Sequence, residues 1–397
     1  MIYYKLEGTV KMRKALRNID KPLLLVTVLL FAIGLIMIFS ASNVTAFMKQ
    51  AESPYYYFLK QGVFLITGIF FIAIPILRCP TKAYSKLSKL LMIIFIGLLV
   101  YVLAFSESVN QAKSWIDLGF FSIQPSEFIK VITIVWLATL YDKISKIKKP
   151  KNEKNNAMDI LLWLPIGIII LVAGLIFFQP DLGTTIIYLM LFTIMFYAAP
   201  QDETFKKKMT LIGIGALLLG GLLFSSGVEF INERQLERLD FFRPCDKLLD
   251  TGSQVCNGYI AINNGGLTGV GLGNSTQKYL YLPEPYTDFI FAIIVEELGL
   301  IAGIGILLLY MFVLYRILLI GRKSYTATGA LICYGIAAYI FIHIAVNLTG
   351  MFGLFILTGV PLPFMSYGGS YTWSLIAALA IVQRINVETK LEERGEL

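Results

Sequence analysis

Charged residues are scarce in this chain. Only 15% of its 397 residues are Asp, Glu, Lys or Arg, whereas 57% are hydrophobic. Soluble domains carry about 25% charged residues, so this composition excludes a soluble globular fold. Apolar stretches long enough to cross a bilayer recur along the sequence, and they predict an all-α polytopic membrane protein with about ten transmembrane helices in a single integral membrane domain, residues 1–397. The predicted spans are residues 22–41, 58–77, 88–105, 122–141, 159–178, 182–199, 209–226, 288–315, 328–347 and 371–386.

Histidine and cysteine are also rare, with one and four residues respectively. Neither type recurs at the spacing of zinc ligands, so the sequence excludes a Cys/His zinc centre. The only histidine, His343, lies within an apolar span, and we interpret it as a hydrogen-bonded packing residue rather than a catalyst. Cys245 and Cys256 lie between spans and could pair in an oxidising compartment. Because spacing alone does not fix disulfide geometry, the sequence leaves that bond open.

The basic residues are unevenly distributed among the connecting segments. They gather in alternate loops, which is the positive-inside asymmetry of membrane proteins and predicts that both termini are cytoplasmic. The cytoplasmic segments are then 1–21, 142–158 and 387–397, and residues 227–287 form a large extracellular loop between helices 7 and 8. The basic segments can also contact anionic membrane lipid. This sidedness explains the net charge of +8, so no nucleic-acid partner is needed.

One carboxylate, Asp288, lies where a polar loop meets an apolar helix on the predicted outer face. A lone acid at the edge of a membrane helix is costly to dehydrate, so it marks a functional site or has a partner. Glu296 and Glu297 follow on the same predicted helix, about 12 to 14 Å further along a straight helix axis. They are too far away to form an acid pair with Asp288, and we expect them to bond to neighbouring helices or to line a cavity.

Other polar motifs fall on the same predicted face. Glu127 is in the first turn of a helix, where the helix dipole favours an acid, and Lys130 follows one turn later and can pair with it. The sequence leaves a structural role and direct substrate contact equally open for this pair. Asp181 at another helix start is typical of an N-cap. The glycines from Gly265 to Gly273 permit close backbone approach, which suits a loop folding over a ligand headgroup.

Short motifs follow one another along the chain in a fixed order. They are Ser40–Ser42, Ala112–Ile116, Gln124–Glu127, Gln179–Thr184, Gly265–Leu267, Gly271–Gly273, Leu282–Glu284, Thr287–Phe291, Glu296–Gly299, Pro361–Phe364 and Ser366–Ser370. Together they resemble the motifs of the SEDS family, the shape, elongation, division and sporulation proteins, which include FtsW, RodA and SpoVE. The resemblance spans nearly the whole chain. This sequence has Tyr286 where many members have histidine, so no catalytic histidine is assigned there.

The resemblance implies an FtsW-type peptidoglycan glycosyltransferase that polymerises lipid II into β-1,4-linked glycan strands at the outer face of the bacterial cytoplasmic membrane. It implies a class B penicillin-binding protein and other division or elongation proteins as partners, and leaves division, elongation and sporulation open. The family's essential aspartate maps onto Asp288. The candidate substrate-binding residues are Lys113, Trp115, Glu127, Lys130, Asp181, Arg238, Ser366, Gly368 and Gly369.

A lipid II substrate would require the acceptor 4-hydroxyl to invert an α linkage into a β linkage. A single inversion needs a general base rather than a protein nucleophile, and we hypothesise that Asp288 is that base. Lys113 and Arg238 are candidate contacts of the leaving pyrophosphate. The sequence fixes no cofactor, and it leaves open a divalent cation, Mg²⁺ or Mn²⁺, held partly by the pyrophosphate.

Two other classes of protein are the alternatives. A flippase or transporter for a lipid-linked precursor also has many helices, but transporters place their acids near the bilayer midplane and contain repeated halves. In this sequence the distinctive residues fall on one face, and no internal repeat is visible. A non-catalytic division scaffold would need helix-packing surfaces but no acid at position 288.

Overall fold

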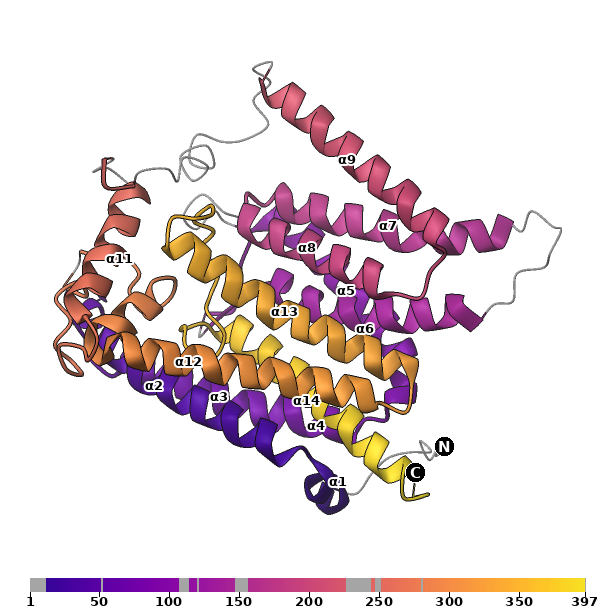
Figure 1. Cartoon of the computed structure of the whole chain (residues 1–397), viewed down its shortest axis with the longest axis horizontal. Coiled ribbons are helices and arrows are strands. Elements are labelled where there is room, and N and C mark those ends of the chain that lie inside the picture. Colours follow the sequence, from indigo (N-terminus) through magenta and orange to yellow (C-terminus); the bar gives the residue numbers. More distant parts are fainter. Residues whose placement is uncertain are drawn as a thin grey trace.

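The protein is a bundle of long helices, shown in Figure 1. The computed structural model describes residues 12–50, 53–106, 114–119, 121–146, 156–225, 244–246, 251–279 and 281–396. The α-helices are α1 (Met12–Asn18), α2 (Lys21–Gln50), α3 (Tyr56–Gly68), α4 (Ile74–Arg78), α5 (Tyr84–Phe105), α6 (Pro125–Lys146), α7 (Asn156–Phe177), α8 (Leu182–Ala198), α9 (Glu203–Ser225), α11 (Thr251–Gly265), α12 (Ile290–Lys323), α13 (Ala327–Met351) and α14 (Gly369–Glu392). The short elements are the π-helical turn η1 (Ile69–Ala73), the 3-10 turns η2 (Thr81–Ala83) and η3 (Pro244–Asp246), and the strands β1 (Ile116–Asp117) and β2 (Ser122–Ile123), which pair antiparallel.

Each of the ten predicted spans coincides with a helix of the described chain, and the span 58–77 is a run of α3, η1 and α4. Within the described residues, five helices are both long and apolar enough to cross a membrane, and two shorter ones are apolar. The all-α polytopic prediction is therefore confirmed. Helices α6 and α14 extend beyond their predicted ends, to Lys146 and Glu392.

Helix α13 occupies the centre of the bundle. Its apolar window is 78% buried, against 17% for the α3 to α4 run and 22% for α5. The peripheral helices can expose leucine and phenylalanine to lipid, whereas a central helix contacts protein on most sides and can hold polar side chains. The polar residues of α6, α13 and α14 therefore meet inside the bundle.

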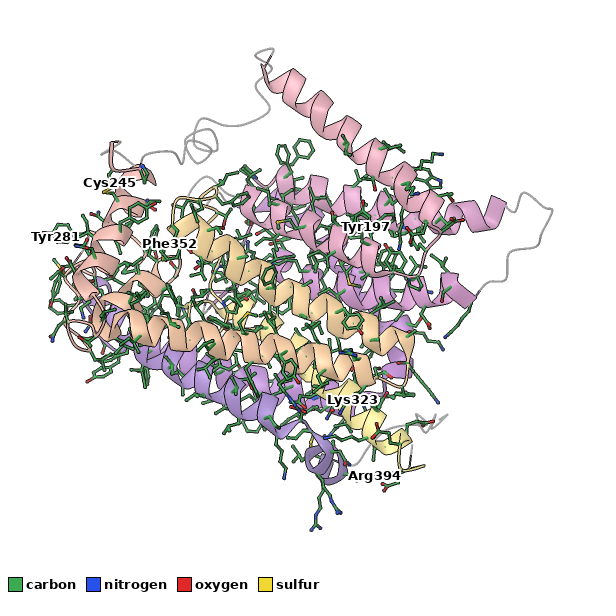
Figure 2. All side chains as sticks on the ribbon, viewed as in Figure 1. Tyr197, Cys245, Tyr281, Lys323, Phe352 and Arg394 are labelled. Atoms are coloured by element: carbon green, nitrogen blue, oxygen red, sulfur yellow. A yellow bond between two sulfur atoms is a disulfide. The ribbon has the colours of Figure 1, made fainter. Side chains whose placement is uncertain are left out.

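The two ends of the bundle differ. At one end α1 packs against the last turns of α14, where Ala15 contacts Val387 and Leu391. We call this the termini end, and Figure 2 shows Lys323 and Arg394 there. At the opposite end, the loop end, lie α11, the segment that joins α11 to α12 and the segment that joins α13 to α14 (Figure 1). Figure 2 places Cys245 and Tyr281 at the loop end.

Helix α12 is interrupted at Gly299, which has φ +84° and ψ +166°. Backbone groups of the preceding loop form hydrogen bonds with the helix groups on both sides of the break. The amides of Val270 and Gly271 donate to the carbonyls of Glu296 and Glu297, at 3.0 Å each. On the other side of the break, the amides of Leu300 and Ile301 donate to the carbonyls of Gly266 and Leu267. The interruption therefore leaves these backbone groups paired, which is what any of them in contact with hydrocarbon would require.

The first segment of α12 folds back on the second. In a straight helix, Gly303 and Phe291 would lie about 18 Å apart along the axis. Instead, a Cβ added at Gly303 would lie 3.3 Å from the Phe291 ring and 3.0 Å from Val295. The straight helix expected for residues 288–315 is therefore wrong at Gly299.

Two glycines of the loop from Gly265 to Gly273 pack directly against the backbone of α12. A Cβ at Gly265 would lie 2.0 Å from the Val295 carbonyl oxygen, and a Cβ at Gly269 would lie 2.3 Å from the Glu297 carbonyl oxygen. Gly265 and Gly269 thus use their close backbone approach for packing within the protein, and a role of the loop over a ligand headgroup stays a prediction.

Glu296 and Glu297 are buried in a polar cluster beneath this loop. Glu297 accepts from Ser40 of α2 at 2.8 Å and forms a 3.0 Å ion pair with Lys278. Glu296 accepts from the amide and hydroxyl of Thr276, at 3.2 and 2.9 Å. Glu297 thus bonds to the neighbouring helix α2, as expected, whereas Glu296 bonds to the loop that precedes α12. The cluster joins α2, α12 and the chain that leads toward Asp288.

Replacing Lys278 by methionine is expected to destabilise the protein by about 3 to 5 kcal/mol, because both side chains of the Lys278–Glu297 pair are 1% exposed or less and the change leaves a buried carboxylate uncompensated. The measurement is thermal unfolding in detergent. Lys146→Met is the matched control, since the Lys146 side chain is 72% exposed and its pair with Asp142 contributes at most about 1 kcal/mol. Lys278→Met/Glu297→Gln should recover much of the loss. Equal effects of Lys278→Met and Lys146→Met would contradict this role.

Candidate functional site

Asp288 lies in the turn that leads into α12, at the loop end. Its side chain is half-buried, whereas the side chains of Tyr286 and Phe289, which flank it closely in the sequence, are buried. The Asn347 side-chain amide donates to the Asp288 carbonyl at 3.0 Å and to the Val360 carbonyl at 2.8 Å. Asp288 is therefore fixed to the end of α13 through its backbone.

A tight turn at residues 358–361 lies beside the Asp288 carboxylate. Gly359 has φ +67°, and a Cβ at this position would lie 3.4 Å from Asp288 Oδ2. Because the residue is glycine, no side chain covers the carboxylate from this direction. On the far side of the turn, a Cβ at Gly183 would lie 2.6 Å from the Thr358 carbonyl oxygen. The turn thus lies between Asp288 and the start of α8.

Asp181 caps α8, as predicted. Its Oδ1 accepts from the Thr184 amide at 3.0 Å, and its Oδ2 accepts from the Gln124 side-chain amide at 2.9 Å. The Gln124 backbone amide in turn donates to Ser370 Oγ at 2.9 Å. The starts of α6, α8 and α14 are therefore joined beside the 358–361 turn. Whether Asp181 also contacts substrate stays a prediction.

Glu127 and Lys130 form the predicted pair on α6. Lys130 Nζ lies 2.9 Å from Glu127 Oε1 and Oε2, and both side chains are at most 5% exposed. Lys130 Nζ also lies 3.2 Å from Nε2 of His343, on α13. His343 thus has a polar partner inside the bundle, in agreement with the hydrogen-bonded packing role expected for it. The buried charges of the pair fit both structural support and substrate contact.

Three candidate residues are occupied by contacts within the protein. Ser366 Oγ accepts from the Leu362 amide at 2.8 Å and donates to the Thr287 carbonyl at 2.6 Å. The Gly368 amide donates to Gln61 Oε1 at 3.2 Å, and a Cβ at Gly369 would lie 2.7 Å from the Phe64 ring. These contacts fix the loop before α14 against the segment that carries Asp288, and substrate binding by the three residues stays a prediction.

The remaining candidates are at the edge of the site or outside the described chain. Trp115 precedes the β1–β2 hairpin, is 36% exposed, and accepts from Ser106 through its carbonyl at 2.5 Å. Lys113 and Arg238 lie outside the residues that the structure describes, so their contact with pyrophosphate stays a prediction.

A tyrosine cluster supports the Asp288 turn, and the sequence reasoning did not find it. Tyr286 donates to the Tyr57 hydroxyl at 3.1 Å, and both rings contact Tyr367. Burial, together with the Tyr57 hydroxyl, raises the pKa of Tyr286 well above the usual range for a phenol. Tyr286 therefore stays protonated and supports the turn rather than acting as a base. Asn347 was also missed, although a lone amide in an apolar span is a signal of a buried polar contact.

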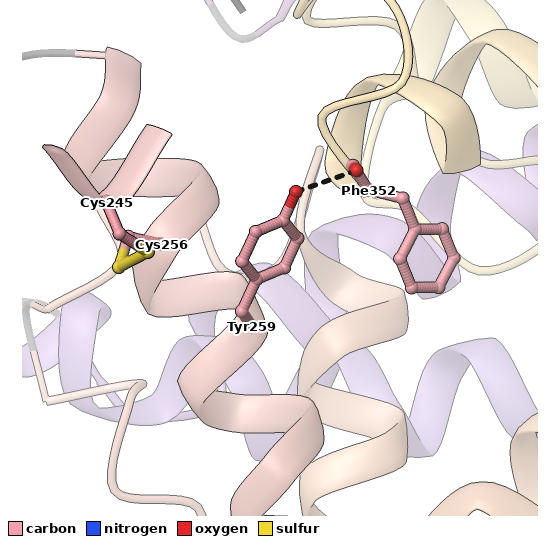
Figure 3. The surroundings of a disulfide bond; sticks show 4 residues. All are labelled: Cys245, Cys256, Tyr259 and Phe352. Carbon is pink, nitrogen blue, oxygen red and sulfur yellow. Dashed lines mark hydrogen bonds between the residues drawn. A yellow bond between two sulfur atoms is a disulfide. The ribbon is translucent and has the colours of Figure 1, made fainter. Parts of the chain in front are cut away.

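A disulfide bond joins Cys245 to Cys256, so the pairing left open by the sequence is confirmed. It links η3 to α11, as Figure 3 shows. One turn further along α11, the Tyr259 hydroxyl donates to the Phe352 carbonyl at 2.7 Å. Through this bond α11 is held against the end of α13, near the segment that leads to the 358–361 turn.

A protein-built metal cage is not part of this arrangement. In the described ranges, no group of three or more His, Cys, Asp or Glu side chains is placed to hold a metal ion. Mg²⁺ in phosphate chemistry is commonly bound by one or two carboxylates together with substrate phosphates, and Asp288 or Asp181 would suffice as such a ligand.

Sequence comparisons point to one family. The model of a family described as cell cycle protein, which comprises FtsW, RodA and SpoVE, matches residues 21–391. The chain is 34% identical to "Probable peptidoglycan glycosyltransferase FtsW" of Bacillus subtilis, over 96% of this chain and 94% of that protein. It is 36% identical to stage V sporulation protein E of the same organism, over 92% and 96% of the two chains.

Two solved structures have the same fold. One is a chain from a peptidoglycan synthase complex studied for the coordination of polymerization and crosslinking, with a TM-score of 0.72 and 24% identity over 93% of this chain and 97% of that chain. The other is the rod shape determining protein RodA of Thermus thermophilus, with a TM-score of 0.65 and 23% identity over 93% and 96%. At these identities the likeness concerns the fold alone.

Proposed function

Because this chain belongs to the FtsW, RodA and SpoVE family of cell cycle proteins, we propose that it is a peptidoglycan glycosyltransferase that polymerises lipid II, with Asp288 as the general base. The observation that carries the assignment of the base is the position of Asp288. It is a half-buried carboxylate in the turn that leads into α12, fixed by its backbone to α13 and facing the glycine of the 358–361 turn. Glu296 and Glu297 are bonded elsewhere, so they do not compete for this role.

The proposed reaction is a single displacement. The acceptor sugar's 4-hydroxyl oxygen forms a bond to the anomeric carbon of the donor, and its proton passes to the Asp288 carboxylate. The bond from the anomeric carbon to the pyrophosphate oxygen breaks, and its electron pair leaves with undecaprenyl pyrophosphate. One displacement inverts the α linkage to β, as in enzymes that use a carboxylate base rather than a nucleophile.

Positive charge near the leaving group would favour its departure. Lys130 is the buried cation that α6 supplies, and we assign it to the pyrophosphate together with Lys113 and Arg238. Mg²⁺ or Mn²⁺ carried by the pyrophosphate would add charge there with one protein carboxylate as ligand. Trp115, Asp181, Ser366, Gly368 and Gly369 would complete the binding surface for the sugars and the lipid.

We place the protein in the bacterial cytoplasmic membrane with the loop end on the outer face and both termini in the cytoplasm. The distribution of lysine and arginine supports this orientation. A class B penicillin-binding protein is the proposed partner, with other division or elongation proteins. The likeness to a chain from a peptidoglycan synthase complex supports a partner of this kind.

Incubation of the purified protein with labelled lipid II tests the proposal. Glycan strands should form, and adding the class B partner should increase their amount. A flippase would instead move lipid II across liposomes without polymer, and a scaffold would bind the partner without either activity. Absence of polymer both with and without the partner would overturn the proposed function.

A further inference from the structure

His343 lies between two groups with separate roles in the proposed mechanism, the Lys130 cation and the Asp288 base. Its Nε2 lies 3.2 Å from Lys130 Nζ on α6. The backbone of Pro361, in the 358–361 turn beside Asp288, lies near the same ring, and Nδ1 makes no hydrogen bond within the described residues. The imidazole therefore lies between the buried cation and the turn against which the Asp288 carboxylate rests.

The Lys130 contact fixes the protonation state of His343. A lysine ammonium has three donors and no acceptor, so Nε2 must accept through its lone pair. Lys130 also forms an ion pair with Glu127, whose carboxylate lies 2.9 Å away. An imidazolium would place a second cation 3.2 Å from that ammonium in the interior of the bundle. The ring is therefore neutral, with its proton on Nδ1.

The surroundings hold the ring in one orientation. The Tyr371 ring stacks on it at 4.8 Å between centroids with an interplanar angle of 25°, and the Tyr339 ring meets it edge-on at 4.7 Å. The Tyr339 hydroxyl is in turn paired with Ser374 at 2.9 Å. His343 is fully buried, so the ring has no route to solvent in this arrangement.

One face of α13 carries both contacts. Asn347 follows His343 by four residues, so the two side chains lie on the same side of the helix. Asn347 holds the backbones of Asp288 and Val360, and His343 holds Lys130. Two adjacent turns of α13 thus hold the Asp288 backbone and the Lys130 side chain, which are the proposed base and the cation proposed for the pyrophosphate.

We propose that neutral His343, protonated on Nδ1, is a positioning residue that orients Lys130 relative to Asp288. It touches no reacting atom. By accepting one N–H of the ammonium, while Glu127 accepts another, it leaves the third N–H with a defined direction. The role of Lys130 toward the leaving group rests on the proposed function. The tautomer of His343 and the contact between His343 and Lys130 do not depend on that function.

The first test is spectroscopic. Because His343 is the only histidine, protein labelled with ¹⁵N-histidine and purified through a tag without histidine gives signals from this ring alone. Solid-state NMR in lipid nanodiscs should show Nδ1 protonated and Nε2 unprotonated at neutral pH, and the Nε2 signal should shift in Lys130→Met. An imidazolium, or a proton on Nε2, would overturn the proposal even if lipid II is polymerised.

The second test is kinetic. His343→Leu should lower kcat/KM for lipid II about tenfold, the order expected for losing a hydrogen bond to a charged group. His343→Gln should stay within about twofold of the unchanged protein, because the side-chain carbonyl of glutamine can accept from Lys130. Lys130→Met/His343→Leu should be no slower than Lys130→Met, since the histidine acts through the lysine.

Two outcomes of the kinetic test would refute the positioning role. One is a glutamine variant as slow as the leucine variant although it unfolds at the same temperature as the unchanged protein. The other is a double variant in which the two losses multiply. If the unchanged protein makes no polymer at all, the proposed function fails, and the NMR signals still decide whether the contact exists.

Discussion

Replacing Asp288 by asparagine is expected to lower the rate of lipid II polymerisation by about 10²- to 10⁴-fold, the contribution typical of a positioned general base. The carboxamide has nearly the same shape as the carboxylate but cannot take the proton of the acceptor hydroxyl. Its backbone bond to Asn347 is made by the carbonyl and should persist. The thermal unfolding temperature and the affinity for the partner should therefore stay unchanged.

Asp142→Asn is the matched control for this variant. Asp142 is a carboxylate near the end of α6 that pairs with Lys146, far from the loops around Asp288. Its removal should leave polymerisation as fast as in the unchanged protein. Polymerisation by Asp288→Asn at more than half of the original rate would refute the general-base role, whatever the control shows.

Alanine at Gly299 is expected to prevent the native arrangement of α12. The backbone there has φ +84° and ψ +166°, a region adopted essentially by glycine alone, which costs a residue with a Cβ about 1 to 3 kcal/mol. The added atom would also lie 2.3 Å from the Leu267 carbonyl oxygen and 2.6 Å from the Gly269 amide, which are backbone atoms that cannot rotate away. We expect a total loss above about 4 kcal/mol, in the range reserved for severe steric disruption.

Gly305→Ala tests whether this loss depends on position. Gly305 lies six residues later in α12, and a Cβ there would meet no atom within 4 Å. Alanine in an exposed helix interior is favoured over glycine by about 1 kcal/mol, so this variant should unfold at the same or a higher temperature. Similar yields of folded, monodisperse protein for Gly299→Ala and Gly305→Ala would show that the break is not required.

Local patterns predicted much of this structure. The ten apolar spans coincide with helices because burial in a membrane requires long apolar segments, and that requirement is visible within about 20 residues of sequence. The N-cap role of Asp181 and the Glu127–Lys130 pair depend on neighbours within four residues, so they too were predictable. The resemblance to the family added Asp288, whose position at a helix start also identified it.

Contacts between distant segments could not be predicted in the same way. Gly299 is an ordinary glycine in an apolar run until the loop from Gly266 to Gly271 is placed against it. The ion-pair partner of Glu297 is Lys278, 19 residues earlier, and the bond depends on how the loop between α11 and α12 packs against α12. Likewise, nothing local indicated that His343 would meet Lys130, which is 213 residues away in the chain.

The completed break in α12 also constrains how the chain can be built into a membrane. During synthesis, residues 266–271 emerge before residues 296–301, which supply the groups they bond to. Until the later segment arrives, the earlier one has open backbone donors and acceptors that hydrocarbon cannot satisfy. The hydrogen bonds between residues 266–271 and 296–301 can form only after both segments have been synthesised, so the break in α12 and the loop that completes it reach their final conformation together.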